Sequence, residues 1–149
     1  MNSVKHRIVI FVFVGDKDTE LVWTDKSTDT LMPVCGHVRK GERVDSAKIR
    51  ILKEFTGVKA KSYQMGFVGS YTVKRRDIGT VKTSCYSINL SHLNVKEDDV
   101  KAHISKSKYS QLQLLSVDDM CEIMTEALNQ TRRISEAFFY LGLVHNAVS

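Results

Sequence analysis

The stretch from residue 33 to residue 58 reads PVCGHVRKGERVDSAKIRILKEFTGV. Its first half contains Gly36 and Gly41, and glycine adopts backbone geometry that bulkier residues resist. We therefore predict a loop that starts at the beginning of this stretch and is closed by Glu42. The second half, from Asp45 to Thr56, is rich in residues that favour a helix.

The predicted helix has defined ends and one apolar face. Asp45 or Ser46 is expected to cap its N-terminus, and Gly57 is expected to end it. One stripe of apolar residues follows steps of three and four along the helix: Val44, Ala47, Ile51, Phe55 and Val58. Such a stripe packs under a neighbouring segment, or contacts a flat ligand or a partner chain.

This loop and helix resemble the Nudix box, G-x5-E-x7-R-E-U-x-E-E-x-G-U, in which U is an aliphatic residue. The matching positions are Gly36, Glu42, Arg50, Leu52, Glu54, Gly57 and Val58. Ile51 and Phe55 stand where the pattern has glutamates. The resemblance covers nearly the whole chain. It implies a Nudix-like α/β/α sandwich with a mixed β-sheet, with the box helix on one side and C-terminal helices on the other.

The resemblance also implies a chemistry. Nudix hydrolases cleave a diphosphate linkage in a nucleoside diphosphate that is joined to another group, and they use magnesium or manganese ions. Positions 51, 54 and 55 are neighbours on a helix surface, so three glutamates there form one acidic patch for a hard cation. Only Glu54 remains of the three in this chain, with Glu42 as a second carboxylate. Mg²⁺ or Mn²⁺ is therefore implied if catalysis survives, and no cofactor if it does not.

Both carboxylates have two interpretations. Glu54 is a catalytic and metal-binding residue, or it is a surface glutamate paired with Arg50, four residues before it. Glu42 belongs to the same catalytic and metal site, or it closes the loop as a structural residue. A carboxylate from outside the box, within the cluster from Glu97 to Asp99, would complete a metal site; the competing interpretation of this cluster is a solvated acidic turn.

The loop itself is basic. Arg39, Lys40 and Arg43 surround its acidic residue, and together with Arg50 they are the predicted ligand-binding residues. Direct contacts from these side chains to phosphate would replace part of the role of a metal. His37 either faces a phosphate or is an ordinary loop histidine.

Candidates elsewhere in the chain have structural explanations beside the functional ones. The basic run from Lys74 to Arg76 binds phosphate or RNA, or it is a solvated hairpin turn. Trp23, Phe67 and Tyr71 stack on a base, or they pack within the strands. Cys35 is better explained as a small buried residue than as a nucleophile.

The remaining segments follow the order expected for this fold. Ile8 to Val14 is rich in β-branched and aromatic residues, which favours a strand buried on both faces over a signal peptide. Four further strands are predicted at Glu20–Thr24, Tyr63–Lys74, Val81–Leu90 and Gln111–Leu115, the middle two forming a hairpin with a bend or bulge. A polar segment is expected at 94–108. Ser116 to Asp119 predicts a helix N-cap, and helices are expected at 120–128 and 132–144.

Composition is that of an ordinary globular protein. The 149 residues predict a single domain from 1 to 149, with 42% hydrophobic and 26% charged residues and a net charge of +5. Three widely spaced cysteines favour a reducing, cytoplasmic compartment. No stretch is apolar enough to cross a bilayer, so no membrane partner is expected. The positive charge favours nucleotides or RNA as partners.

Three functional hypotheses follow. The favoured one is recognition of a nucleoside-diphosphate-type ligand (a nucleotide, nucleotide-sugar or capped RNA) with hydrolysis weak or lost. The first alternative is an active, divalent-metal-dependent nucleoside-diphosphate-X pyrophosphohydrolase that uses Glu54 and non-standard ligands. The second is a protein–protein interaction module, with a homodimer left open, that uses the apolar stripe and the segment AFFYLGLV at 137–144.

Overall fold

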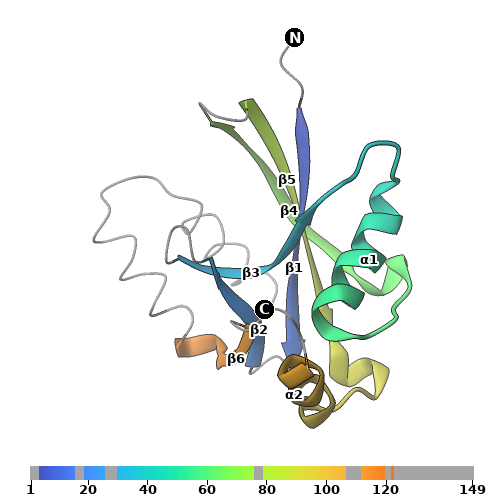
Figure 1. Ribbon diagram of the computed structural model, residues 1–149, viewed down its shortest axis with the longest axis vertical. Helices are drawn as coiled ribbons and strands as arrows, with labels where there is room; N and C mark the ends of the chain where they lie inside the picture. The colour runs from blue at the N-terminus through green and yellow to red at the C-terminus, as the bar shows by residue number, and fades with distance from the viewer. Residues whose placement is uncertain are drawn as a thin grey trace.

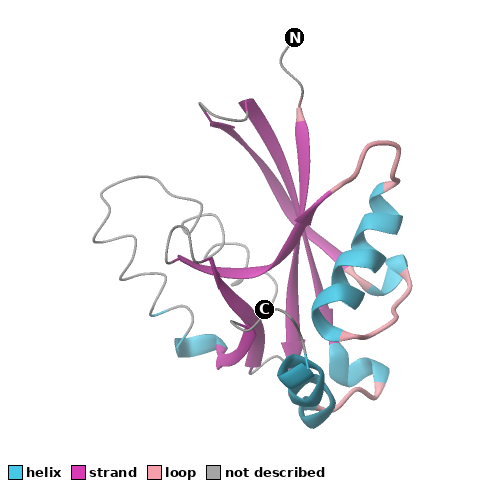
Figure 2. Cartoon of the chain, viewed as in Figure 1, coloured by secondary structure: helices cyan, strands magenta, loops and turns pink. Residues whose placement is uncertain are grey.

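A computed structural model of the chain describes residues 4–15, 19–25, 30–75, 79–106, 112–119 and 122. Its elements are β1 Lys5–Val14, β2 Thr19–Asp25, β3 Thr30–His37, α1 Val44–Thr56, the 3₁₀ turn η1 Ser62–Gln64, β4 Gly66–Arg75, β5 Gly79–Asn89, the 3₁₀ turn η2 Leu90–Leu93, α2 Glu97–Lys106 and β6 Leu112–Ser116. Figures 1 and 2 show the strands as one continuous sheet with α1 alongside it. No helix in the described residues is long and apolar enough to span a membrane.

The sheet is mixed, as predicted. Its strand order is β4-β5-β1-β3-β2-β6, and β1 also pairs with the start of β2. β1 runs parallel to β5 and antiparallel to β3. The remaining pairings are antiparallel. The central position of β1 explains why its sequence is apolar without alternation.

Both faces of β1 are buried, which confirms the prediction for this strand. Ile8, Ile10, Val12 and Val14 belong to the core cluster that also contains residues of α1. Val9, Phe11 and Phe13 point to the opposite face and are equally inaccessible to solvent. The alternation of side chains along a strand produces two buried rows from one apolar run.

The apolar stripe of α1 packs inside the chain. Ala47, Ile51 and Phe55 are in the core cluster, and Val44 and Val58 pack against it partly buried. The three central residues of the stripe are therefore buried against the sheet and are not accessible to a flat ligand or a partner chain. The other segment named for the interaction hypothesis, at 137–144, is outside the described residues.

The predicted loop starts later than expected. β3 continues to His37, in register with Arg7 of β1, so Gly36 lies within a strand and has no positive φ. The predicted role of Gly36 in a loop is therefore wrong. Gly41, by contrast, has a φ of +76° and does permit the turn that leads into α1.

The ends of α1 partly match the prediction. The helix begins at Val44 and its N-cap is Arg43, with no side-chain cap, so the predicted caps Asp45 and Ser46 are wrong. Asp45 instead lies in the first turn, where a carboxylate complements the helix dipole. At the other end Gly57 has a φ of +73° and donates its N–H to Lys53 O at 2.8 Å, which confirms the predicted end.

The C-terminal half of the described chain contains the predicted hairpin and an α-helix that was not predicted. β4 and β5 pair with a bulge between Phe67 and Gly69. β4 ends at Arg75, one residue beyond the predicted strand end at Lys74, so Arg75 lies in the strand and not in the expected turn. The segment expected to be merely polar contains α2. At the end of β6, Ser116 Oγ accepts the Asp119 N–H at 3.1 Å, as its cap signature predicts. The helices predicted at 120–128 and 132–144 lie outside the described residues, apart from Glu122.

Candidate functional site

The side chain of Arg50 forms hydrogen bonds to both ends of the loop between β3 and α1. Its Nε donates to Glu42 Oε2 at 2.9 Å, and its Nη2 donates to Glu42 Oε1 at 3.0 Å. The same Nη2 donates to the backbone oxygen of His37 at 2.8 Å. Glu42 Oε1 also accepts the Arg39 N–H at 3.0 Å. The planar guanidinium suits this two-pronged contact and joins both ends of the loop to the helix.

The carboxylate of Glu42 accepts hydrogen bonds from other groups of the protein. The hydrogen bonds from the Arg50 side chain, followed by the one from the Arg39 backbone, lower the pKa of Glu42 to about 2. The side chains of Arg50 and Glu42 are only 20% and 15% exposed. Both oxygens of Glu42 already have donors, so the arrangement matches the loop-closing interpretation of this residue.

Glu54 is the more accessible carboxylate of the box, with 38% of its side chain exposed. Its Oε1 lies 3.5 Å from Arg50 Nη1 and 3.8 Å from Arg39 Nη2. Two guanidinium groups therefore approach one carboxylate oxygen. The ion pair with Arg50 that the sequence spacing suggested is present.

The two positions where the box pattern has glutamates belong to the core. Ile51 is 1% exposed and Phe55 is 5% exposed. Ile51 packs so closely on β3 that a Cβ atom on Gly36 would lie 3.0 Å from its Cγ1 and Cδ1. This part of the box is a packing surface in this chain.

The acidic cluster of α2 does not complete a metal site with these residues. Asp99 Oδ2 accepts the Lys96 N–H at 3.1 Å, and Glu97 pairs with Lys101 at 3.5 Å. Both contacts lie at the N-terminal end of α2 and stabilise that helix. In the described part of the chain, no three His, Cys, Asp or Glu side chains gather where they could hold a metal ion. The residues present do not fit the three-carboxylate patch implied by the resemblance.

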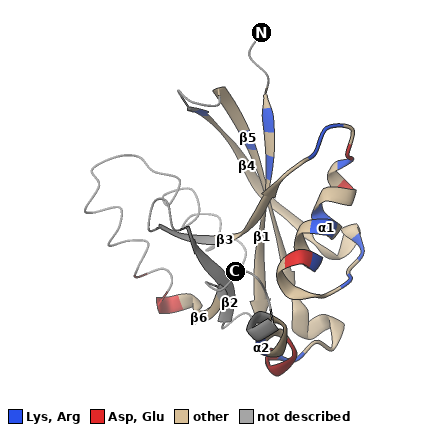
Figure 3. Ribbon diagram, viewed as in Figure 1, with Lys and Arg blue, Asp and Glu red and all other residues tan. Residues whose placement is uncertain are grey.

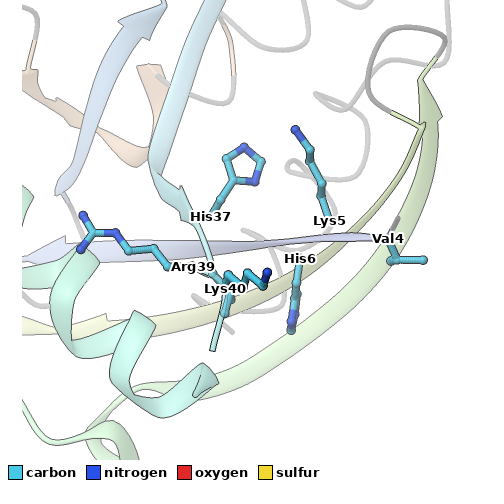
Figure 4. A pocket seen from close by; sticks show the side chains of 7 residues that line it. Val4, Lys5, His6, His37, Arg39 and Lys40 are labelled. Atoms are coloured by element: carbon cyan, nitrogen blue, oxygen red, sulfur yellow. The ribbon is translucent and has the colours of Figure 1, made fainter. Parts of the chain in front are cut away.

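A basic pocket of about 530 Å³ lies beside the loop, on the side of β1. Its lining residues are Val4, Lys5, His6, His37, Val38, Arg39 and Lys40 (Figure 4). Lys and Arg are visible along the start of β1 and along the loop after β3 in Figure 3. Two of the four predicted ligand-binding residues, Arg39 and Lys40, line this pocket. The other two do not: Arg50 holds the loop, and Arg43 is an exposed residue at the helix N-cap.

Lys5 and His6 were not among the predicted site residues. These two residues lie far from the loop in the sequence, so their positions in the sequence do not associate them with it. The pairing of β1 with β3 places them beside the loop. His6 Nε2 lies 2.9 Å from Ser84 Oγ on β5. Burial, followed by the nearby charge of Lys82, lowers the pKa of His6. Lys82 is the register partner of His6 on β5 and adds positive charge near the pocket.

The remaining candidates have structural roles or lie apart from the loop. Tyr71 OH accepts a hydrogen bond from Arg7 Nη2 at 3.3 Å within the sheet. Phe67 is 65% exposed and meets Tyr86 edge to face, with ring centroids 5.7 Å apart. Cys35 is partly buried in β3. Neither aromatic residue lines the basic pocket.

Several solved structures have a fold similar to that of this chain. A NUDIX hydrolase from Nitrosomonas europaea matches with a TM-score of 0.64 and 16% identity, over 97% of this chain and 90% of that one. Shewanella oneidensis NrtR matches with a TM-score of 0.62 and 17% identity, over 97% and 61%. C. elegans Ap4A hydrolase matches with a TM-score of 0.57 and 14% identity, over 97% and 96%.

The matched structures differ widely in how much of their own length this chain covers. This chain spans only 38% of the length of a MutT/nudix family protein from Enterococcus faecalis. No protein-family model and no curated protein matches the sequence. The structural matches show that the chain has the Nudix fold, as the box in its sequence predicted.

Proposed function

We propose that this chain recognises a nucleoside-diphosphate-type ligand, such as a nucleotide, a nucleotide-sugar or capped RNA, and that hydrolysis is weak or lost. The observation that carries the proposal is the burial of Ile51 and Phe55 in the core. These positions would have to supply charged oxygen atoms to a cation in a hydrolase of the usual kind. Buried apolar side chains cannot do so.

The electrostatics of the loop support the same proposal. A divalent cation at Glu54 would lie beside the guanidinium groups of Arg50 and Arg39, which already approach its carboxylate. Like charges at that separation repel, and the second box carboxylate, Glu42, is held by Arg50. The local charge balance therefore favours an anion over a cation.

Arginine and lysine are suited to replace a metal in phosphate recognition. Charge-assisted hydrogen bonds to phosphate are roughly twice as strong as neutral ones. Arg39, Lys40 and Arg43 all have exposed side chains on the loop, so their donors are accessible to a ligand. Binding through these residues needs no change in the core.

Calorimetric titration tests the proposal. Magnesium and manganese are titrated separately into the wild type, alone and with a non-hydrolysable ADP-ribose analogue. Glu54→Gln is the test variant, and Glu97→Gln is the control because it removes an exposed carboxylate from α2. We expect the analogue to bind with EDTA present and the metals to give no saturable heat in any variant.

Three outcomes would contradict the proposal. Saturable metal binding that Glu54→Gln removes and Glu97→Gln retains would show a surviving metal site. Magnesium-dependent turnover of ADP-ribose with the same dependence on Glu54 would establish the pyrophosphohydrolase alternative. If neither metal nor analogue binds, nucleotide recognition of this type is wrong.

A further inference from the structure

The basic pocket forms where β1 begins and β3 ends. Arg7 is the register partner of His37, and Val38 N donates to His6 O at 2.9 Å, so the two antiparallel strands stay paired to the edge of the loop. The loop then turns toward α1 with the help of Gly41. This path brings Lys40 next to the start of β1.

The lining of the pocket has charge of one sign. It contains three cations and two histidines, and none of its seven residues is acidic. Among the described residues, neither Lys5 nor Lys40 forms an ion pair. Figure 4 shows Lys5 and His37 on the same side of β1, His6 on the other side, and Arg39 directed away from Lys5.

The two carboxylates of the box do not neutralise the two lysines of this pocket. Glu42 has both oxygens engaged by Arg50 and the Arg39 N–H. Glu54 pairs with Arg50 on α1 and with Arg39, the third cation of the pocket. Both carboxylates are therefore committed on the helix side of the loop, while lysine ammonium groups remain on the side of β1.

We propose that this pocket binds the phosphate groups of the ligand directly and without a divalent metal, with Lys5 and Lys40 as the main contacts. The inference rests on the proposed function and gives the phosphate groups a position beside β1 instead of against Glu54. The volume of about 530 Å³ lies within the usual range for small-ligand sites, roughly 300–1,000 Å³, and accepts a diphosphate unit. His6, held by Ser84 Oγ, forms part of the wall.

The test compares two charge-matched double variants in EDTA. Lys5→Gln with Lys40→Gln removes two exposed cations from the pocket. Lys53→Gln with Lys59→Gln removes two exposed cations near the end of α1 and serves as the control. Inorganic pyrophosphate and the non-hydrolysable ADP-ribose analogue are titrated into both variants and the wild type. Thermal unfolding confirms that each variant is folded, which the exposure of all four residues favours.

We expect the pocket variant to bind both probes at least about tenfold more weakly than the wild type, because it lacks two charge-assisted contacts. The control variant should bind within about threefold of the wild type, because its lost charges are remote and screened. Added salt should weaken binding to the wild type more than to the pocket variant.

The outcomes separate this inference from the proposed function. If the analogue binds the pocket variant and the wild type equally, the pocket inference is wrong and nucleotide recognition stands. If pyrophosphate binding depends on the two lysines but the analogue does not bind, the pocket is an anion site and the proposed function is wrong. If neither probe binds the wild type, both are wrong.

Discussion

Ile51 on α1 lies directly over Gly36 on β3. A Cβ atom added to Gly36 would come within 3.0 Å of both Cγ1 and Cδ1 of Ile51. That separation is shorter than the ordinary contact distance between carbon atoms, about 3.5–4.0 Å. Because Ile51 is 1% exposed, it has little room to move away. The pair sets how closely the helix approaches the sheet.

The first prediction concerns this contact. Gly36→Ala should lower the free energy of unfolding by about 1–3 kcal/mol through overpacking. Ile51→Val alone, which removes Cδ1, should lower the free energy of unfolding by about 0.5–1.5 kcal/mol. The double variant should lose less stability than the sum of the two single losses, because valine lacks Cδ1 and so removes one of the two close contacts. Urea unfolding of the wild type, the two single variants and the double variant measures this coupling. Strictly additive losses of unfolding free energy would contradict it.

The second prediction restores a glutamate of the box. Ile51→Glu should destabilise the chain by about 3 kcal/mol or more, because a carboxylate would be buried at an apolar position. It should create no magnesium affinity. Lys53→Glu is the matched control, since it adds the same side chain at an exposed position of α1. Thermal unfolding and calorimetry measure both effects; a stable Ile51→Glu protein that binds magnesium would reverse our interpretation of the box.

The features that the sequence predicted correctly depend on local patterns. The apolar run of β1 requires a strand buried on both faces, and Gly57 ends α1 because its φ is positive. The bulge in β4 similarly follows from its glycines. In the site, the spacing of Arg50 and Glu54 was enough to predict their ion pair.

Two of the features that were missed depend on tertiary packing. The role of Gly36 becomes apparent only when Ile51 is placed above it. Lys5 lies beside the loop in the basic pocket because β1 pairs with β3, and the sequence does not reveal this pairing. For α2 a signal did exist: Glu97 to Asp99 form an acidic first turn, which is typical of a helix start. The apolar content of that segment was too low to suggest a helix.

The third prediction concerns pH. The pKa of Glu42 lies at about 2 in the folded chain, below its ordinary value of 4.5, mainly because Arg50 hydrogen-bonds the carboxylate. A lowered folded pKa stabilises the protein above the unfolded pKa, and this stabilisation is lost as the pH falls toward the folded pKa. The stability advantage of the wild type over Glu42→Gln should therefore be full above about pH 5 and shrink steadily toward pH 2.

Arg50→Gln provides the control for the pH experiment. Because Arg50 is the principal cause of the shift, Glu42→Gln made in the Arg50→Gln background should change the pH dependence much less. Urea unfolding between pH 2 and pH 7 measures both comparisons. An advantage of the wild type that stays constant across this range would show that Glu42 does not titrate as the contacts require.

The fourth prediction concerns Lys48, a buried lysine of α1, although lysine is rarely buried in folded proteins. Its Nζ donates to Ser62 O and Ser62 Oγ at 3.0 Å each and to Met65 O at 3.3 Å, and it lies 4.1 Å from the centre of the Tyr86 ring. Lys48→Met should lower the free energy of unfolding by about 1–3 kcal/mol, because two backbone oxygens lose their donor.

A competing effect determines how this fourth prediction can fail. Burial lowers the pKa of Lys48, which means that the folded protein disfavours its charge, and methionine would remove that desolvation cost. We expect the lost hydrogen bonds to outweigh this gain, since all three donors have partners. The control is Lys53→Met, at an exposed position, which should change stability by less than about 0.5 kcal/mol. A Lys48→Met protein at least as stable as the wild type in urea would show that desolvation is the larger effect.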